Sequence, residues 1–218
     1  MNIRERFDAS MQENDRLVLK MMSRVKTLYE AIFDVLKEND IKAAEAIIDG
    51  DIEINALEEL INEHAYIVIL KQCPVASDLR KLVTAIKVAN ELERIADYAA
   101  NIAVYIKKTV QNNESYRKLM YIYRDPLVKM LETLLEAYHE TDVKKAFDVC
   151  DIDNKIDVIY EEQIKKFISI TREKTQIVAE EASRALLVIK QLERAGDHLT
   201  NIAEHIIFLK TGKHVTLN

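Results

Sequence analysis

The stretch ELERIADYAANIA occupies residues 91–103, and the stretch QLERAGDHLTNIA occupies residues 191–203. The two stretches begin 100 residues apart and share seven of their thirteen positions. Neither contains proline, and Gly196 is the one glycine in them. Uninterrupted runs of this kind are typical of helices. The sequence therefore predicts the same helix twice, which indicates an internal duplication.

Both predicted helices carry the pattern Glu-x-x-x-Asp-x-x-x-Asn. Its members are Glu93, Asp97 and Asn101 in the first copy, and Glu193, Asp197 and Asn201 in the second. Side chains four residues apart share one face of a helix. At about 100° per residue, apolar residues such as Leu82 and Ile86 fall close to Glu93. We therefore expect these carboxylates to lie in the middle of the apolar stripe, where Arg94 and Lys87 provide no obvious counter-ion.

An unpaired carboxylate removed from water costs on the order of several kcal/mol. Two carboxylates at positions i and i+4 also repel each other. A metal ion would hold both groups at once, because carboxylate oxygens suit magnesium, manganese, calcium and iron ions. The spacing alone leaves two other interpretations open, a cation from another helix and a face that is open to solvent.

The composition predicts an all-α protein. The chain has 218 residues with three Gly and two Pro, and helices dominate where these breakers are rare. Apolar residues do not alternate with period two, as they do in half-buried strands. A hydrophobic fraction of 49% at this length suffices for one sizeable core or two small ones.

Charge and hydropathy exclude several classes of function. The net charge of −6 leaves no basic stripe for nucleic acid, and no apolar run approaches the roughly 18 residues that span a bilayer. The first sixteen residues are too charged for a signal peptide. Cys73 and Cys150 are far apart, which argues against a Cys-x-x-Cys site and favours reduced thiols. We therefore expect a cytoplasmic protein that does not bind nucleic acid.

Hydrophobic periodicity predicts six helices, arranged as two tandem three-helix-bundle repeats with approximate internal two-fold symmetry. The first repeat takes residues 1–112 and the second residues 113–218. The expected helices cover residues 4–38, 40–71, 74–111, 115–140, 142–174 and the segment that carries the second copy of the motif up to 211. Such a duplication implies two equivalent sites.

Local signals support these boundaries. Asp40 and Asp142 are 102 residues apart, and each is predicted to cap the helix that follows it. Pro74 is expected in the first turn of the third helix. Pro126 predicts either a kink in the fourth helix or a start there. Gly212 is the expected C-terminal cap of the last helix.

The chain resembles the PhoU family of phosphate-uptake regulators over essentially its whole length. The resemblance rests on the doubled Leu-Glu-Arg-x-x-Asp-x-x-x-Asn-Ile-Ala and on Asp78-Leu79-Arg80 ahead of the first copy. It also rests on Cys73-Pro74-Val75-Ala76 and on the related segments at 51–55 and 153–157. One copy of the motif alone would be weak evidence, and the doubling makes it strong.

The resemblance implies a metal-binding, peripheral cytoplasmic adaptor, often a homodimer. Such a protein links the Pst phosphate ABC transporter to the histidine kinase PhoR and represses phosphate-starvation genes. Its implied metal ligands are Glu93 and Asp97 in the first repeat, and Glu193 and Asp197 in the second. The implied metals are iron, zinc, manganese or magnesium, in some members as multinuclear clusters. Asn101 and Asn201 would be supporting residues.

The two copies of the motif also differ. His198 stands where the first copy has Tyr98, so a nitrogen ligand is available to the second site alone, and Glu204 replaces Val104. Asp34 and Glu136 are secondary ligand candidates on neighbouring helices, with exposed helix charge as the alternative. The sites are therefore expected to differ in affinity or stoichiometry.

The sequence predicts a regulator rather than an enzyme. It shows no nucleophile-and-base arrangement and no glycine-rich phosphate loop. An alternative is a ferritin-like di-iron enzyme, whose bundles use Glu-x-x-His from two helices. Here this pattern occurs once, from Glu136 to His139. A third interpretation is a regulator of a low-affinity phosphate permease.

Overall fold

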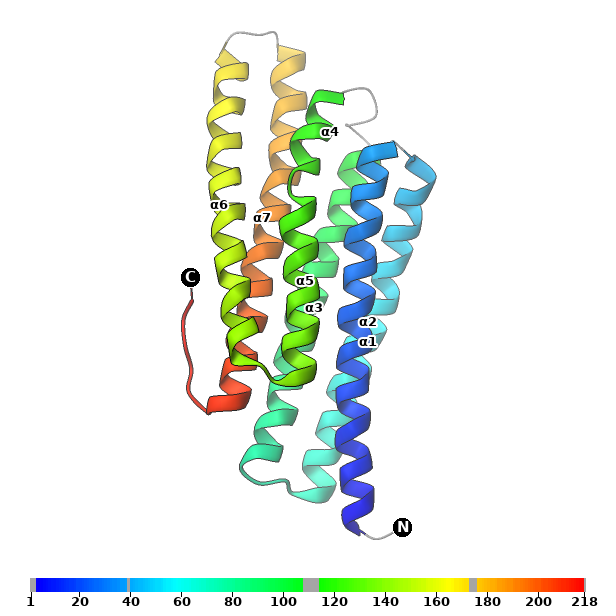
Figure 1. The fold of residues 1–218 in the computed structure, drawn as a ribbon. Coiled ribbons are helices and arrows are strands. Elements are labelled where there is room, and N and C mark those ends of the chain that lie inside the picture. Colours follow the sequence, from blue (N-terminus) through cyan, green and yellow to red (C-terminus); the bar gives the residue numbers. More distant parts are fainter. Residues whose placement is uncertain (1–2, 39, 108–113, 173–175, 218) are drawn as a thin grey trace.

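The computed structural model describes residues 3–38, 40–107, 114–172 and 176–217 (Figure 1). Its helices are α1 (Ile3–Glu38), α2 (Ile41–Gln72), α3 (Ser77–Tyr105), α4 (Glu114–Tyr121), α5 (Arg124–Glu140), α6 (Val143–Arg172) and α7 (Gln176–Thr211). Because α4 and α5 are the two parts of one broken helix, the prediction of six helices in an all-α fold is confirmed. None of the helices in the described ranges is long and apolar enough to cross a membrane.

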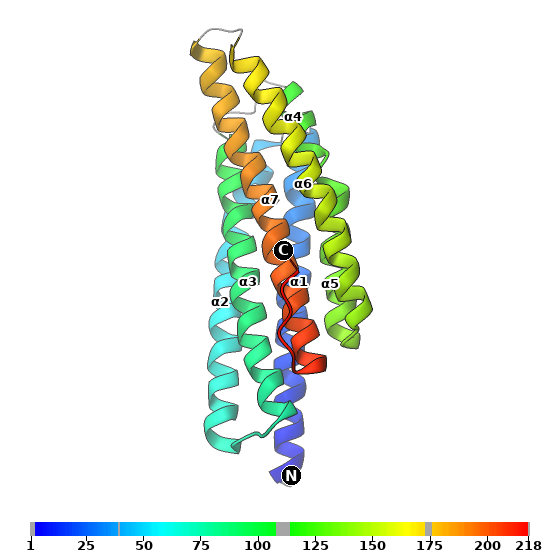
Figure 2. The ribbon, with the colours of Figure 1, turned by 90° about the vertical axis from the view of Figure 1, so that its left-hand side faces the viewer.

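The helices form two layers (Figures 1 and 2). The first layer has the order α2–α3–α7–α6, because α3 packs against α7, α2 packs against α3, and α6 packs against α7. The second layer consists of α1, which covers α2 and α3, and α5, which covers α6 and α7. Each repeat is thus a three-helix bundle, and the two bundles meet along α3–α7 and along α1–α5.

One hydrophobic core runs through both bundles. It joins Tyr29 and Phe33 of α1 with Leu92 of α3 and Leu192 of α7, all of which have no exposed surface. Burying a large apolar side chain contributes about 1.5–3 kcal/mol, so this shared core holds the repeats together. The predicted boundary between residues 112 and 113 lies outside the described residues.

The predicted caps are present in the structure. Asp40 accepts hydrogen bonds from the backbone N–H groups of Lys42 and Ala43, at 3.0 and 3.3 Å. Asp142 does the same at the start of α6, at 2.8 and 3.3 Å. Gly212 ends α7 with φ 71°, a left-handed conformation that glycine adopts without strain. These local signals therefore set the helix ends.

Pro126 explains the interruption between α4 and α5. A proline inside a helix removes one backbone hydrogen bond, and its ring clashes with the carbonyl of the residue four positions earlier. That residue is Ile122, which lies in the break between Tyr121 and Arg124. Of the two predicted outcomes, the structure shows a helix start next to the proline, because α4 ends at Tyr121 and α5 begins at Arg124.

The turn between α2 and α3 differs from the prediction. Pro74 was expected in the first turn of the third helix, but α3 begins at Ser77 and Ala76 occupies its N-cap position. Cys73 and Ala76 both have positive φ angles, of 46° and 47°. These two residues with positive φ angles complete the turn, and the hydrophobic periodicity of the sequence does not predict them.

Candidate metal centres

The motif carboxylates lie at the edge of the buried face of their helices, so the prediction that they occupy its middle is wrong. On α3 the large side chains of Val88, Leu92 and Ile95 are among those that are fully buried, whereas Glu93 and Asp97 are half-buried. Helix α3 packs on α1, α2 and α7 at once, which buries a wide arc. The apolar residues counted around Glu93 left out Val88, Leu92 and Ile95 on the other side of that arc, and so placed its middle too close to Glu93.

In the second repeat, three carboxylates converge between α6 and α7. One ligand atom from each of Asp157, Glu193 and Asp197 lies within 4.8 Å of the other two. Asp157 is exposed, Asp197 is half-buried, and Glu193 is 9% exposed. The set is therefore open to solvent on the side of α6 and closed on the side of the core.

Asp153 lies one turn before Asp157 on α6 and is 5% exposed. The Thr200 hydroxyl donates a hydrogen bond to its Oδ2 at 2.9 Å, and its Oδ1 is buried without a partner in the described structure. Burial raises the pKa of Asp153 to about 7, and the charges of Asp157 and Asp197 act in the same direction. Gly196 leaves room for this group, because a Cβ at that position would overlap Asp153 Oδ1.

Lys190 is the counter-ion of the second set. Its Nζ lies 2.7 and 2.5 Å from the two carboxylate oxygens of Glu193, one turn along α7. It also lies 4.9 Å from the centre of the Tyr160 ring. Asn90 occupies the equivalent position in the first repeat, so no lysine balances Glu93 in this way. The two sites thus differ in a lysine that lies outside the Glu-x-x-x-Asp-x-x-x-Asn motif and is present in the second repeat.

The first repeat gathers a similar acidic set between α2 and α3. Burial raises the pKa of Glu93, and the charges of Asp97, Glu58 and Asp51 raise it further. Burial and the charge of Asp97 also raise the pKa of Asp51. Arg94 is a weak partner, with its Nε 3.6 Å from Glu93 and its side chain 63% exposed. Within the described residues, only the second set brings three ligand atoms within 4.8 Å of one another.

Both sets suit a cation with oxygen ligands. Several carboxylates that repel each other are relieved together by one divalent or trivalent ion. Burial raises the pKa of Glu93 in the first set and of Asp197 in the second, which shows that both sets lack enough compensating charge. Hard ions such as magnesium, manganese and iron accept this donor set without nitrogen or sulfur ligands. Asp157, Glu193 and Asp197 would hold the ion in the second repeat, and Lys190 would have to release Glu193.

The secondary candidates lie elsewhere. Asp34 is exposed, and Glu136 is exposed and pairs with Lys145 at 2.8 Å, so both are helix surface charges. Asn101 is also exposed. His198 and Asn201 contact Glu91 of α3.

These two residues form a polar seam between the repeats. His198 Nδ1 lies 2.6 Å from Glu91 Oε2, and Asn201 Nδ2 donates to the same oxygen at 3.1 Å. Tyr98 lies on the other side of the imidazole, with its hydroxyl 3.0 Å from His198 Nε2. Burial by itself raises the pKa of Glu91, but the hydrogen bonds from His198 and Asn201 outweigh it and lower the pKa. His198 is therefore placed to join α7 to α3.

We expect Glu91→Ala to destabilise the protein by about 1.5–3 kcal/mol, the usual cost of losing hydrogen bonds to a charged group. The replacement leaves the imidazole of His198 and the amide of Asn201 without their acceptor. Urea unfolding followed by circular dichroism measures the change. Glu91→Gln keeps an oxygen acceptor at the same place and should lose less, and equal losses in both variants would contradict this role for the carboxylate.

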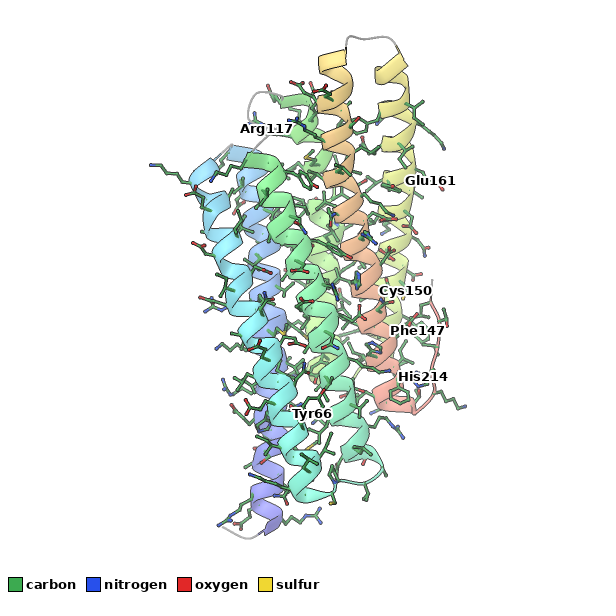
Figure 3. The ribbon with its side chains drawn as sticks, turned by 180° about the vertical axis from the view of Figure 1, so that it is seen from behind. Tyr66, Arg117, Phe147, Cys150, Glu161 and His214 are labelled. Carbon is green, nitrogen blue, oxygen red and sulfur yellow. The ribbon has the colours of Figure 1, made fainter. Side chains whose placement is uncertain are left out.

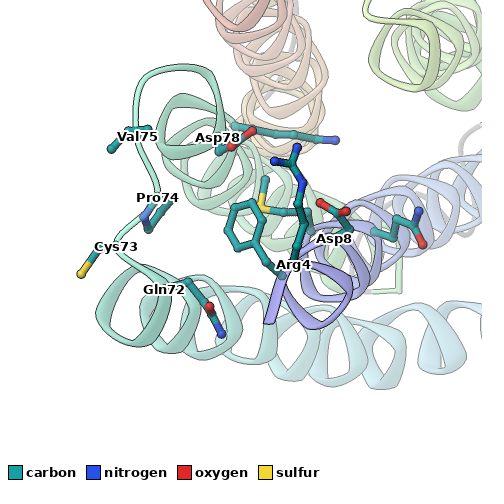
Figure 4. A pocket seen from close by; sticks show the side chains of 11 residues that line it. Arg4, Asp8, Gln72, Cys73, Pro74, Val75 and Asp78 are labelled. Carbon is teal, nitrogen blue, oxygen red and sulfur yellow. The ribbon is translucent and has the colours of Figure 1, made fainter. Parts of the chain in front are cut away.

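A cavity of about 730 Å³ opens at the turn between α2 and α3 (Figure 4). Arg4 and Asp8 of α1 line it on one side, and Pro74 and Asp78 on the other. Its lining includes none of the carboxylates in the two acidic sets. The candidate metal centres are therefore separate from this cavity.

Comparison with known proteins identifies the family. The PhoU domain model matches the chain twice, over residues 18–106 and 125–206. The chain belongs to the PhoU family. Members of this family are regulatory accessory proteins and not enzymes. The two matches fall on the two three-helix repeats.

Individual relatives agree along nearly the whole chain. A phosphate-specific transport system accessory protein PhoU homolog from Clostridium acetobutylicum is 33% identical over 220 residues, which covers 99% of each chain. The crystal structure of the phosphate transport system regulatory protein PhoU from Streptococcus pneumoniae superposes with a TM-score of 0.88 at 26% identity, over 96% of this chain and 99% of that one. The crystal structure of PhoU from Pseudomonas aeruginosa superposes with a TM-score of 0.89 at 26% identity, over 95% of this chain and 100% of that one.

Sequence reasoning missed three residues of the second set. Asp153 and Asp157 belong to the segment 153–157, which is related to 51–55, but the offset of 102 residues gives no information about what these side chains face. Lys190 precedes Glu193 by three residues, a spacing at which helical side chains meet. That spacing was available in the sequence and would have identified the counter-ion.

Proposed function

We propose that this protein regulates phosphate uptake as a metal-loaded adaptor on the cytoplasmic side of the membrane, between a phosphate ABC transporter and a histidine kinase. Membership in the PhoU family supports the regulatory role, because the relatives are named as accessory proteins of phosphate-specific transport. The converging carboxylates of Asp157, Glu193 and Asp197 are the observation that supports the metal. The kinase and the homodimer rest on the family resemblance.

In this proposal the metal acts as a structural clamp. An ion held by Asp157 of α6 and by Glu193 and Asp197 of α7 fixes the two helices against each other. The resulting face of the four-helix layer then has a defined charge and shape for a partner. In the structure, Glu136 of the single Glu-x-x-His segment is exposed and paired with Lys145, which does not support the di-iron alternative. A low-affinity permease is the second candidate partner.

A reporter for phosphate-starvation genes tests this function in a bacterium that lacks its own family member. Expression of the full chain in phosphate-rich medium should repress the reporter, and the variant Glu193→Ala/Asp197→Ala should repress it less. Glu132→Ala/Glu140→Ala removes the same charge from α5, in the other layer, and should repress normally. Repression by the site variant at the level of the natural chain would refute the role of the metal.

A further inference from the structure

A basic pocket lies between the C-terminal end of α1 and the short helix α4, on different helices from both acidic sets. Its volume is about 420 Å³. Lys37 of α1 and Arg117 and Lys118 of α4 line it, together with Tyr121 and Glu114. Figure 3 shows Arg117 at the end of the molecule where α4 begins. The pocket thus concentrates positive charge in a chain whose net charge is −6.

Two of the three cations in this basic pocket form no ion pair with a described residue, although Arg117 interacts with the charge of Glu114. Lys118 pairs with Glu114 at 2.7 Å. Lys37 and Arg117 form no ion pair within the described parts of the chain, and Arg117 Nη1 is buried without a hydrogen-bond acceptor. A buried donor that is left unpaired costs about 1–3 kcal/mol, and more when it is charged. The pocket is therefore incomplete as it stands, and an anion would satisfy it.

The basic pocket is not part of the duplicated design. At the offset of 102 residues that relates Asp40 to Asp142, the residue equivalent to Arg117 is Asp15, which has the opposite charge. The break that Pro126 causes separates α4 from α5, whereas α1 continues without interruption through the same region of the first repeat. Residues 114–122 also lie outside both PhoU domain matches. The α4 side of the pocket therefore lies outside the two family matches, whereas Lys37 lies within the first.

We propose that the basic pocket binds a phosphate group. The guanidinium of Arg117 presents a planar fork of donors that matches two oxygens of a phosphate, and Lys37 adds a point charge. Leu36 and Ile122 form an apolar wall in the same cavity, which suits an organic substituent on that group. Free phosphate and a phosphomonoester share this chemistry. This inference rests on the proposed function, since it would let a phosphate regulator bind phosphate directly. The basic pocket shares no residue with the two acidic sets.

Isothermal titration of the purified full chain with inorganic phosphate and with phenyl phosphate tests the proposal. The variant Lys37→Gln/Arg117→Gln should bind at least about tenfold more weakly, because it loses charge-assisted hydrogen bonds. Arg16→Gln/Lys165→Gln removes two exposed charges elsewhere and should bind as the natural chain does. Tighter binding of phenyl phosphate would identify an organic phosphate as the ligand, and equal or tighter binding of inorganic phosphate would identify the free ion.

Failure to bind either probe would overturn the proposal, as would an equal loss in the pocket variant and the control. Phosphate held by metal ions in the acidic sets would persist in the pocket variant, and full persistence would also overturn it. Arg117→Lys keeps the charge but not the fork, so an intermediate loss is expected even if the double variant folds poorly. Loss of repression in the reporter test concerns the metal variant alone, so the two proposals can fail independently.

Discussion

Replacing Glu193 and Asp197 with alanine should remove the metal ion of the second repeat and leave the first repeat loaded. Supporting residues around a metal commonly contribute about 10–100-fold in affinity, so removal of two direct ligands should cost more than about 100-fold. Elemental analysis of the purified full chain measures the bound metal. The reciprocal variant, Glu93→Ala/Asp97→Ala, should spare the second repeat. Because the first set converges less closely, its metal should be released by a lower concentration of chelator.

Glu132→Ala/Glu140→Ala is the matched control, since it removes two carboxylates from α5 and should keep the full metal content. Unchanged metal in both site variants would show that the ligands lie elsewhere. A thermal melt separates the remaining alternative. If the first set holds no ion, Glu93→Ala/Asp97→Ala should raise the melting temperature, because a pair of carboxylates that repel each other is lost.

The contribution of Asp153 to the stability of the metal-free protein should fall as the pH rises from about 4 to about 7. The folded-state pKa of Asp153, about 7, lies above its ordinary value of 3.8. In that window the folded state holds a proton that the unfolded state has lost. The stabilising contribution is therefore complete below the unfolded pKa and disappears as the pH passes the folded pKa.

Asp153→Asn should remove this dependence, because the amide stays neutral and its oxygen still accepts from Thr200. Urea unfolding in the presence of a chelator should show the variant gaining more than about 1 kcal/mol on the natural chain between about pH 5 and pH 8. Asp151 is exposed on the same helix, and Asp151→Asn should show no such gain. A constant difference between Asp153→Asn and the natural chain across this range would contradict the raised pKa.

Sequence reasoning reached the helices, the caps and the duplication because each depends on neighbours in the chain. Asp40 and Asp142 bond to backbone groups two and three residues away, and Pro126 acts four residues back. The same reasoning misplaced Pro74, because the turn depends on backbone reversals at Cys73 and Ala76. It also missed Asp157 as a member of the acidic set, because nothing on α6 alone reports which part of α7 lies opposite.

By itself, then, the sequence determined an all-α chain of two repeated units, the capped ends of its helices and the family to which it belongs. The tertiary structure alone decided which carboxylates converge, that His198 meets Glu91 in the polar seam between the repeats, and that Arg117 lines a pocket in which its Nη1 has no acceptor among the described residues. The physical reason is that helix formation follows local hydrogen bonds and spacing, whereas a site depends on the relative rotation of packed helices. That rotation is set by the shape of the whole core.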